Sequence, residues 1–305
     1  MKHFGSIVRS YTYLVLTYFA LILLLPVDHV VAQKYMLDSV EYHALRFLLA
    51  IPLVIVWFAA FYAAAAVRDY AEKIKKTAEG PGFAMLARGC KWLAWRVSLP
   101  SVISLPLNTI GDNHPSLHPT IIIITNYLSL VLLLIAFSLI STATRSLSQQ
   151  TKKPASLSSL RNLQLVFVTG GVFYCYLIFR YLNLHSLTSS HNPYFLPTWL
   201  LIITIIIPTL YAWFIGLLAA FDVRWTANQA PGLLYRRALQ FLASGLVVVI
   251  ACLVAIQYLT TVIPRTGHLS LGAALVVIYT IYLFAIAGFG LLAWGASRLL
   301  RIEEV

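Results

Sequence analysis

Charged residues are scarce in this chain of 305 amino acids, of which only 10% are Asp, Glu, Lys or Arg while 60% are hydrophobic. Globular domains carry about 25% charged and about 45–50% apolar residues, so this composition excludes an ordinary water-soluble domain. The net charge of +12 would suit nucleic acid only if Lys and Arg shared one solvated face, whereas here they lie between long apolar runs. The composition predicts an integral membrane protein in contact with the lipid bilayer and no nucleic-acid partner.

Cysteine is equally sparse, since Cys90, Cys175 and Cys252 are the only three and have no paired spacing. This excludes a disulfide framework and a thiolate metal site. The chain also lacks a Walker loop, a GxSxG motif, an HExxH motif and an intramembrane carboxylate pair. The absences favour a function without catalysis.

Seven apolar runs are each long enough to cross a bilayer, because a hydrocarbon core of about 30 Å needs about 20 helical residues. The runs cover approximately residues 11–31, 43–67, 120–143, 163–184, 195–221, 238–263 and 271–296. The sequence therefore predicts an all-α, polytopic helix bundle in the cell membrane.

An eighth stretch, residues 92–110, is apolar but carries Arg96, Pro100 and Pro106. Hydropathy alone favours a re-entrant or interfacial segment, which would leave seven spans. If the stretch crosses the bilayer, most of the 22 Lys and Arg residues fall on one side. The positive-inside rule then favours eight transmembrane helices with both termini in the cytoplasm.

Similar short sequence patterns recur along the chain at a nearly constant separation. Residues 52–58 and 208–214 share the pattern Pro-x4-Trp-Phe, 156 positions apart. Further matches with offsets of 150 to 156 are Pro81-Gly82 with Pro231-Gly232, His114-x-Ser-Leu with His268-x-Ser-Leu, Tyr127-Leu with Tyr282-Leu, and Arg145 with Arg298. Their shared order predicts an internal duplication.

We expect the duplication to produce two four-helix repeats, residues 1–150 and 151–305. Because four is an even number, both repeats would enter the membrane in the same orientation, related by a pseudo-two-fold axis along the membrane normal.

The second and sixth predicted helices each carry a pair of small residues four positions apart, Ala60 with Ala64 and Gly216 with Ala220. Close backbone approach at small residues holds helices together in lipid, so we expect tight packing there, either within the bundle or between these two helices. The alternative is that alanine is simply common in membrane spans.

Ionisable groups inside the membrane are candidate functional residues. Arg96 lies in the proline-bearing stretch, where freed carbonyls beside a cation are typical of a transporter cavity. Alternatively, its side chain snorkels toward the cytoplasm. Asn126 and Gln257 are the other candidate substrate-binding residues, unless they only form hydrogen bonds between helices.

Seven of the eight histidines would lie on the extracytoplasmic side in this topology. Imidazole and carboxylate together suit a divalent metal, whereas imidazole alone suits a pH response. The residues favoured for such a site are Asp112, His114 and His268. The alternative is that these side chains simply occupy polar loops, and no other cofactor is predicted.

Residues 68–91, which begin with Arg68 and end with Lys91, mix charged and apolar residues at helical spacing. They are expected either to lie on the inner membrane surface against anionic lipid headgroups or to continue the second helix into solvent.

Three functions remain open. The first is a small transporter or permease with a polar site between the repeats. The second is a non-catalytic membrane subunit or scaffold that packs against other membrane proteins or a second copy of itself. The third is a metal- or pH-responsive protein that uses the extracytoplasmic His and Asp residues.

Overall fold

A computed structural model describes residues 4–27, 32–33, 35–113, 118–150, 207–230, 232–266 and 270–302. Within these ranges the chain forms seven long helices: α1 (Phe4–Leu24), α3 (Ser39–Lys73), α4 (Gly80–Asn113), α5 (His118–Gln150), α9 (Ile207–Gln229), α10 (Leu233–Thr266) and α11 (Leu271–Ile302). The all-α class is confirmed for these residues. The predicted span 163–184 lies outside them.

Six of the described helices are long and apolar enough to cross a membrane, namely all except α4. Helix α4 falls short because prolines and charged residues interrupt its apolar run. Such a set of helices is what a multi-pass membrane protein requires.

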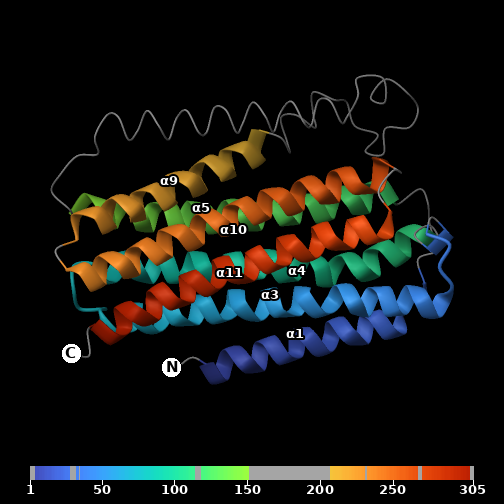
Figure 1. Cartoon of the computed structure of the whole chain (residues 1–305), viewed down its shortest axis with the longest axis horizontal. Coiled ribbons are helices and arrows are strands. Elements are labelled where there is room, and N and C mark those ends of the chain that lie inside the picture. The colour runs from blue at the N-terminus through green and yellow to red at the C-terminus, as the bar shows by residue number, and fades with distance from the viewer. Residues whose placement is uncertain are drawn as a thin grey trace.

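The helices α3, α4, α5, α9, α10 and α11 form a closed ring in chain order, because each packs on the next and α11 packs back on α3. Helix α1 lies outside the ring against α3 and α4. In Figure 1 the helices run side by side along the long axis, and both ends of the chain lie at one end of the bundle. One continuous hydrophobic core contains residues from all seven helices.

Helix α3 begins at a capping box and contains a proline. The Asp38 side chain accepts a hydrogen bond from the Glu41 amide at 2.7 Å, and the Glu41 carboxylate accepts one from the Asp38 amide at 3.2 Å. Pro52 has no N–H, so it cannot donate to the carbonyl of Leu48 one turn earlier. The hydroxyl of Tyr279 on α11 donates to this carbonyl at 2.6 Å, which ties the two helices together.

Helix α4 continues through both of its prolines, Pro100 and Pro106, from one end of the ring to the other. A neighbouring helix supports the backbone close to the first proline, since the buried Trp57 indole N–H donates to the Val97 carbonyl at 3.2 Å. Prolines are tolerated in membrane helices that are covered by neighbouring helices. Residues 92–110 are therefore a continuous helical segment packed between α3 and α5.

Glycines bring α4 and α5 into close contact. A Cβ atom at Gly89 would lie 3.1 Å from both the Ala136 carbonyl oxygen and the Ile140 amide nitrogen. One heptad earlier, a Cβ at Gly82 would lie 2.9 Å from a methyl group of Leu147. The two helices are therefore antiparallel, and their backbones come close to each other at Gly89.

Helices α10 and α11 make a crossing of the same kind. A Cβ at Gly245 would lie 2.7 Å from the Gly288 carbonyl oxygen and 2.9 Å from the Leu292 amide nitrogen. One at Gly295 would lie 2.8 Å from the Ala238 carbonyl oxygen. In both crossings a glycine on the first helix faces a carbonyl group and, four residues later, an amide group on the second.

Candidate functional site

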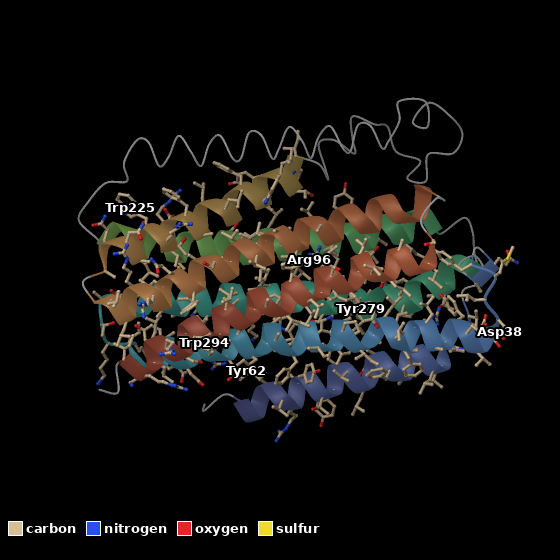
Figure 2. All side chains as sticks on the ribbon, in the orientation of Figure 1. Asp38, Tyr62, Arg96, Trp225, Tyr279 and Trp294 are labelled. Atoms are coloured by element: carbon tan, nitrogen blue, oxygen red, sulfur yellow. The ribbon has the colours of Figure 1, made fainter. Side chains whose placement is uncertain are left out.

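The buried charge of Arg96 is the main candidate for a functional group inside the bundle. Its side chain is only 7% exposed, and it is the one charged residue among the buried polar side chains of the described part. Figure 2 shows Arg96 midway between the end that holds Asp38 and the end that holds Trp225. Removing a guanidinium from water is costly, so such a residue is a functional candidate unless the structure needs it.

The helical register indicates which neighbour Arg96 faces. Gly89 packs on Ile140 of α5, and Arg96 follows Gly89 by seven residues, which is two turns with a drift of about 20°. The same step along the antiparallel α5 leads from Ile140 to Leu133, and the buried Ser129 lies one turn further on. The register therefore places the Arg96 backbone on the side of α4 that faces α5, and a site between the two halves stays a prediction.

The corresponding position in α10 carries no charge. Gly245 occupies the place of Gly89 in the α10–α11 crossing, and the next heptad position after Gly245 is Cys252. Cys252 is buried, with 6% exposure. A cysteine in the second crossing thus stands where the first crossing has a buried arginine, and the candidate site is asymmetric.

The other predicted polar site residues are only partly described. The backbone of Asn126 belongs to α5 and that of Gln257 to α10, but their side chains lie outside the described residues. The same holds for Asp112 in the last turn of α4, and His114 and His268 lie wholly outside. The described part of the chain contains no group of three or more His, Cys, Asp or Glu that could hold a metal. The metal site and the roles of Asn126 and Gln257 stay predictions.

The four small residues expected at helix contacts are all buried: Ala60, Ala64, Gly216 and Ala220. A Cβ at Gly216 would lie 3.1 Å from the Ile250 side chain on α10 and 3.3 Å from the Phe137 ring on α5. Helix α3 has its main contacts with α4 and α11, and α9 has its main contacts with α5 and α10. The two helices occupy opposite places in the ring.

Tyr235 and Glu79 form a polar contact that sequence reasoning missed. The Tyr235 hydroxyl donates to the Glu79 carboxylate at 2.6 Å, and both side chains are partly buried. Nearby, the Tyr70 ring packs edge-on against Phe83 at 4.8 Å between centroids. A sequence signal for the pair did exist, because 156 positions separate the two residues, as they separate the repeated Pro-x4-Trp-Phe patterns.

Positive charge gathers at the end of the bundle that holds both termini, which we call the cationic end. Its exposed cations include Arg68, Lys75, Lys76, Arg88, Lys91, Arg145, Arg224, Arg236, Arg237, Arg298 and Arg301. Residues 68–91 at this end are the last turns of α3, a short connection, and the first turns of α4. They are therefore not one separate surface helix.

The described residues thus combine a closed apolar ring, one buried arginine in a proline-containing helix and a strongly basic end. No family model, curated protein or solved structure matches this chain. The function is therefore argued from the geometry.

Proposed function

We propose that the chain is a small transporter or permease of the cell membrane that moves a small anion past Arg96. The observation that carries the proposal is the burial of Arg96, a residue that is only 7% exposed and lies in the middle of the bundle. A cation at the centre of a membrane helix costs about 2.5–3.5 kcal/mol on insertion scales, so its presence calls for a function. Helix α4 also contains Pro100 and Pro106, and transporter binding sites are often built on interrupted helices.

The proposed transporter consists of two four-helix repeats, residues 1–150 and 151–305. The cyclic order of the ring supports this. A rotation of the ring by half a circle exchanges α3 with α9, α4 with α10 and α5 with α11. It maps every pair of neighbouring helices onto another pair of neighbouring helices. The two glycine crossings support it as well, since Gly245 follows Gly89 by 156 positions and Leu292 follows Ile140 by 152.

We further propose eight spans with both termini in the cytoplasm. Helices α5 and α9 both run toward the cationic end in Figure 1, which is the shared direction that the eight-span topology gives to its fourth and sixth spans. Helix α4 has 34 residues and is about 51 Å long, more than the thickness of the hydrocarbon core. The positive-inside rule assigns the cationic end to the cytoplasm.

The chemistry of the site favours a small anion as substrate. A guanidinium offers a planar set of N–H donors that match carboxylate, phosphate or sulfate oxygens in pairs. The alanine-rich, apolar core argues against a large hydrophilic substrate. We therefore expect an inorganic oxyanion or a short carboxylate.

Uptake into proteoliposomes tests the proposal. The wild type should take up at least one of phosphate, sulfate or a short carboxylate. Arg96→Gln should reduce this uptake at least about tenfold, because the anion loses a charge-assisted contact. Arg88→Gln is the matched control, because Arg88 is exposed on the same helix. Absence of flux for every anion in the wild type, or equal loss in both variants, would overturn the proposal.

A second candidate is a non-catalytic membrane subunit, favoured by the continuity of the apolar core through all seven described helices. In that case Arg96 has only a structural role, and the chain should co-purify in mild detergent with a stoichiometric membrane-protein partner or a second copy. A lone monodisperse species that shows anion flux would exclude this candidate.

A further inference from the structure

We propose that the outer face of the α10–α11 pair binds the headgroup of an anionic phospholipid between Arg237 and Arg298. The floor of the site is aromatic, since the rings of Phe241 and Trp294 are 6.2 Å apart and remain 37% and 54% exposed. The Arg298 guanidinium lies 5.6 Å from the centre of the Trp294 ring. This is a cation stacked on an interfacial aromatic side chain at the membrane-facing surface.

The helical register brings the two arginines to the same level. Helices α10 and α11 are antiparallel, and Phe241 pairs with Trp294 across them. Arg237 precedes Phe241 by one turn, and Arg298 follows Trp294 by one turn. Both steps lead about 6 Å toward the cationic end, so the exposed arginines stand opposite each other above the aromatic pair.

Two opposed guanidinium groups suit a phosphodiester. A guanidinium stacked on a ring keeps its N–H donors in its own plane, where they can bind phosphate oxygens. Trp side chains favour the headgroup level of a bilayer, which is where a lipid phosphate lies. The charge and the level both match an anionic headgroup.

The surface beside this site also accommodates an acyl chain. Gly290 lies one turn from Trp294 toward the middle of α11, and a Cβ built there would meet nothing within 4 Å. Further along the same helix, Leu283 and Phe284 are 65% and 59% exposed. An acyl chain can lie along this exposed apolar surface while its headgroup contacts the two cations. The site therefore favours a lipid over a soluble anion.

The site is absent from the related crossing of α4 and α5. The positions 156 residues before Arg237 and Phe241 hold Pro81 and Met85, and those 152 residues before Trp294 and Arg298 hold Thr142 and Ser146. These positions hold no aromatic pair, and the one cation beside them is Arg145, the residue that the repeat matches with Arg298. The quartet Arg237, Phe241, Trp294 and Arg298 is therefore a particular feature of the second crossing.

Lipid binding to the purified full chain tests the inference. Native mass spectrometry in mild detergent would compare retention of phosphatidylglycerol and phosphatidylcholine. The chain has seven tryptophans, so proximity to Trp294 would be read from the part of the quenching by brominated forms of the same lipids that Trp294→Phe removes. We expect the wild type to prefer the anionic lipid about 25-fold, about fivefold for each arginine. The Arg237→Gln and Arg298→Gln double variant should lose this preference.

The matched control is the Arg88→Gln and Arg224→Gln double variant, which removes two exposed cations from the same end of the bundle. It should keep the preference and the selective quenching. Equal loss in both double variants would overturn the inference, because the preference would then reflect only overall charge. Displacement of the lipid by glycerol phosphate would also overturn it, since the site would then bind a soluble anion. Both readouts are independent of anion transport.

Discussion

The Tyr235 hydroxyl donates a 2.6 Å hydrogen bond to the Glu79 carboxylate, and the two residues are 156 positions apart. The same number separates Gly89 from Gly245, which make equivalent contacts in the two glycine crossings. Two positions related by a two-fold axis can touch each other only beside that axis. Under the proposed duplication, this hydrogen bond therefore marks the pseudo-axis at the cationic end.

Tyr235→Phe removes only the hydroxyl and leaves the Glu79 carboxylate without this donor. We expect the free energy of unfolding to fall by about 1.5 kcal/mol, since hydrogen bonds to charged groups are stronger than neutral ones and this pair is only half-buried. Denaturation in mixed detergent micelles measures the change. Tyr211→Phe is the control, because Tyr211 is 58% exposed, and an equal effect of both substitutions would contradict the prediction.

Tyr279→Phe should destabilise the bundle by about 0.6–1 kcal/mol, because the Leu48 carbonyl then loses the donor that compensates for Pro52. The effect depends on the proline, since Pro52→Ala restores a backbone N–H at that position. In a double-mutant cycle, Tyr279→Phe should cost less in the Pro52→Ala background. A cost that is the same in both backgrounds would show that the hydroxyl does not compensate for the proline.

Gly245→Ala should separate α10 from α11, because its Cβ would lie 2.7 Å from the Gly288 carbonyl oxygen. Overpacking of this kind destabilises by about 1–3 kcal/mol and should lower the melting temperature of the purified protein. Gly290→Ala is the matched control on the partner helix, where a Cβ meets nothing within 4 Å and alanine favours the helix. A lower melting temperature for Gly290→Ala, together with an unchanged one for Gly245→Ala, would show that the packed and open faces of the two helices are assigned wrongly.

Helix α4 should carry the chain from one side of the membrane to the other. In a chain without its native cysteines, Asp112→Cys should react with a membrane-impermeant maleimide added outside intact cells. Lys76→Cys and Lys152→Cys should react only after the cells are opened, because the positive-inside rule assigns them to the cytoplasm. Labelling of Asp112→Cys and Lys152→Cys in the same compartment would exclude the eight-span topology.

Much of the fold was predictable from local composition. The long apolar runs predicted an all-α membrane bundle, and six described helices that can cross a membrane agree with this. The length of helix α4 could not be obtained in this way, because hydropathy penalises Arg96, Pro100 and Pro106 wherever they occur. In the bundle, α3 and α5 cover the helix, and the Trp57 indole donates to its backbone beside the first proline.

The candidate sites were less predictable than the fold. Sequence reasoning singled out Arg96, which is buried midway along the bundle, and its place between the two halves stays a prediction. The proposed lipid site combines residues 61 positions apart in sequence, Arg237 and Arg298, and neither is unusual on its own. Only the antiparallel pairing of α10 and α11 makes them neighbours.

The sequence by itself determined the all-α class and the approximate positions of the long apolar helices, because each depends on the composition of a short segment. Tertiary structure alone decided the order of helices around the ring, the partners of Gly89 and Gly245, and the hydrogen bond from Tyr235 to Glu79. These features depend on which helix faces meet and at what register. Contacts between segments far apart in the chain decide this, and the composition of one segment contains no information about them.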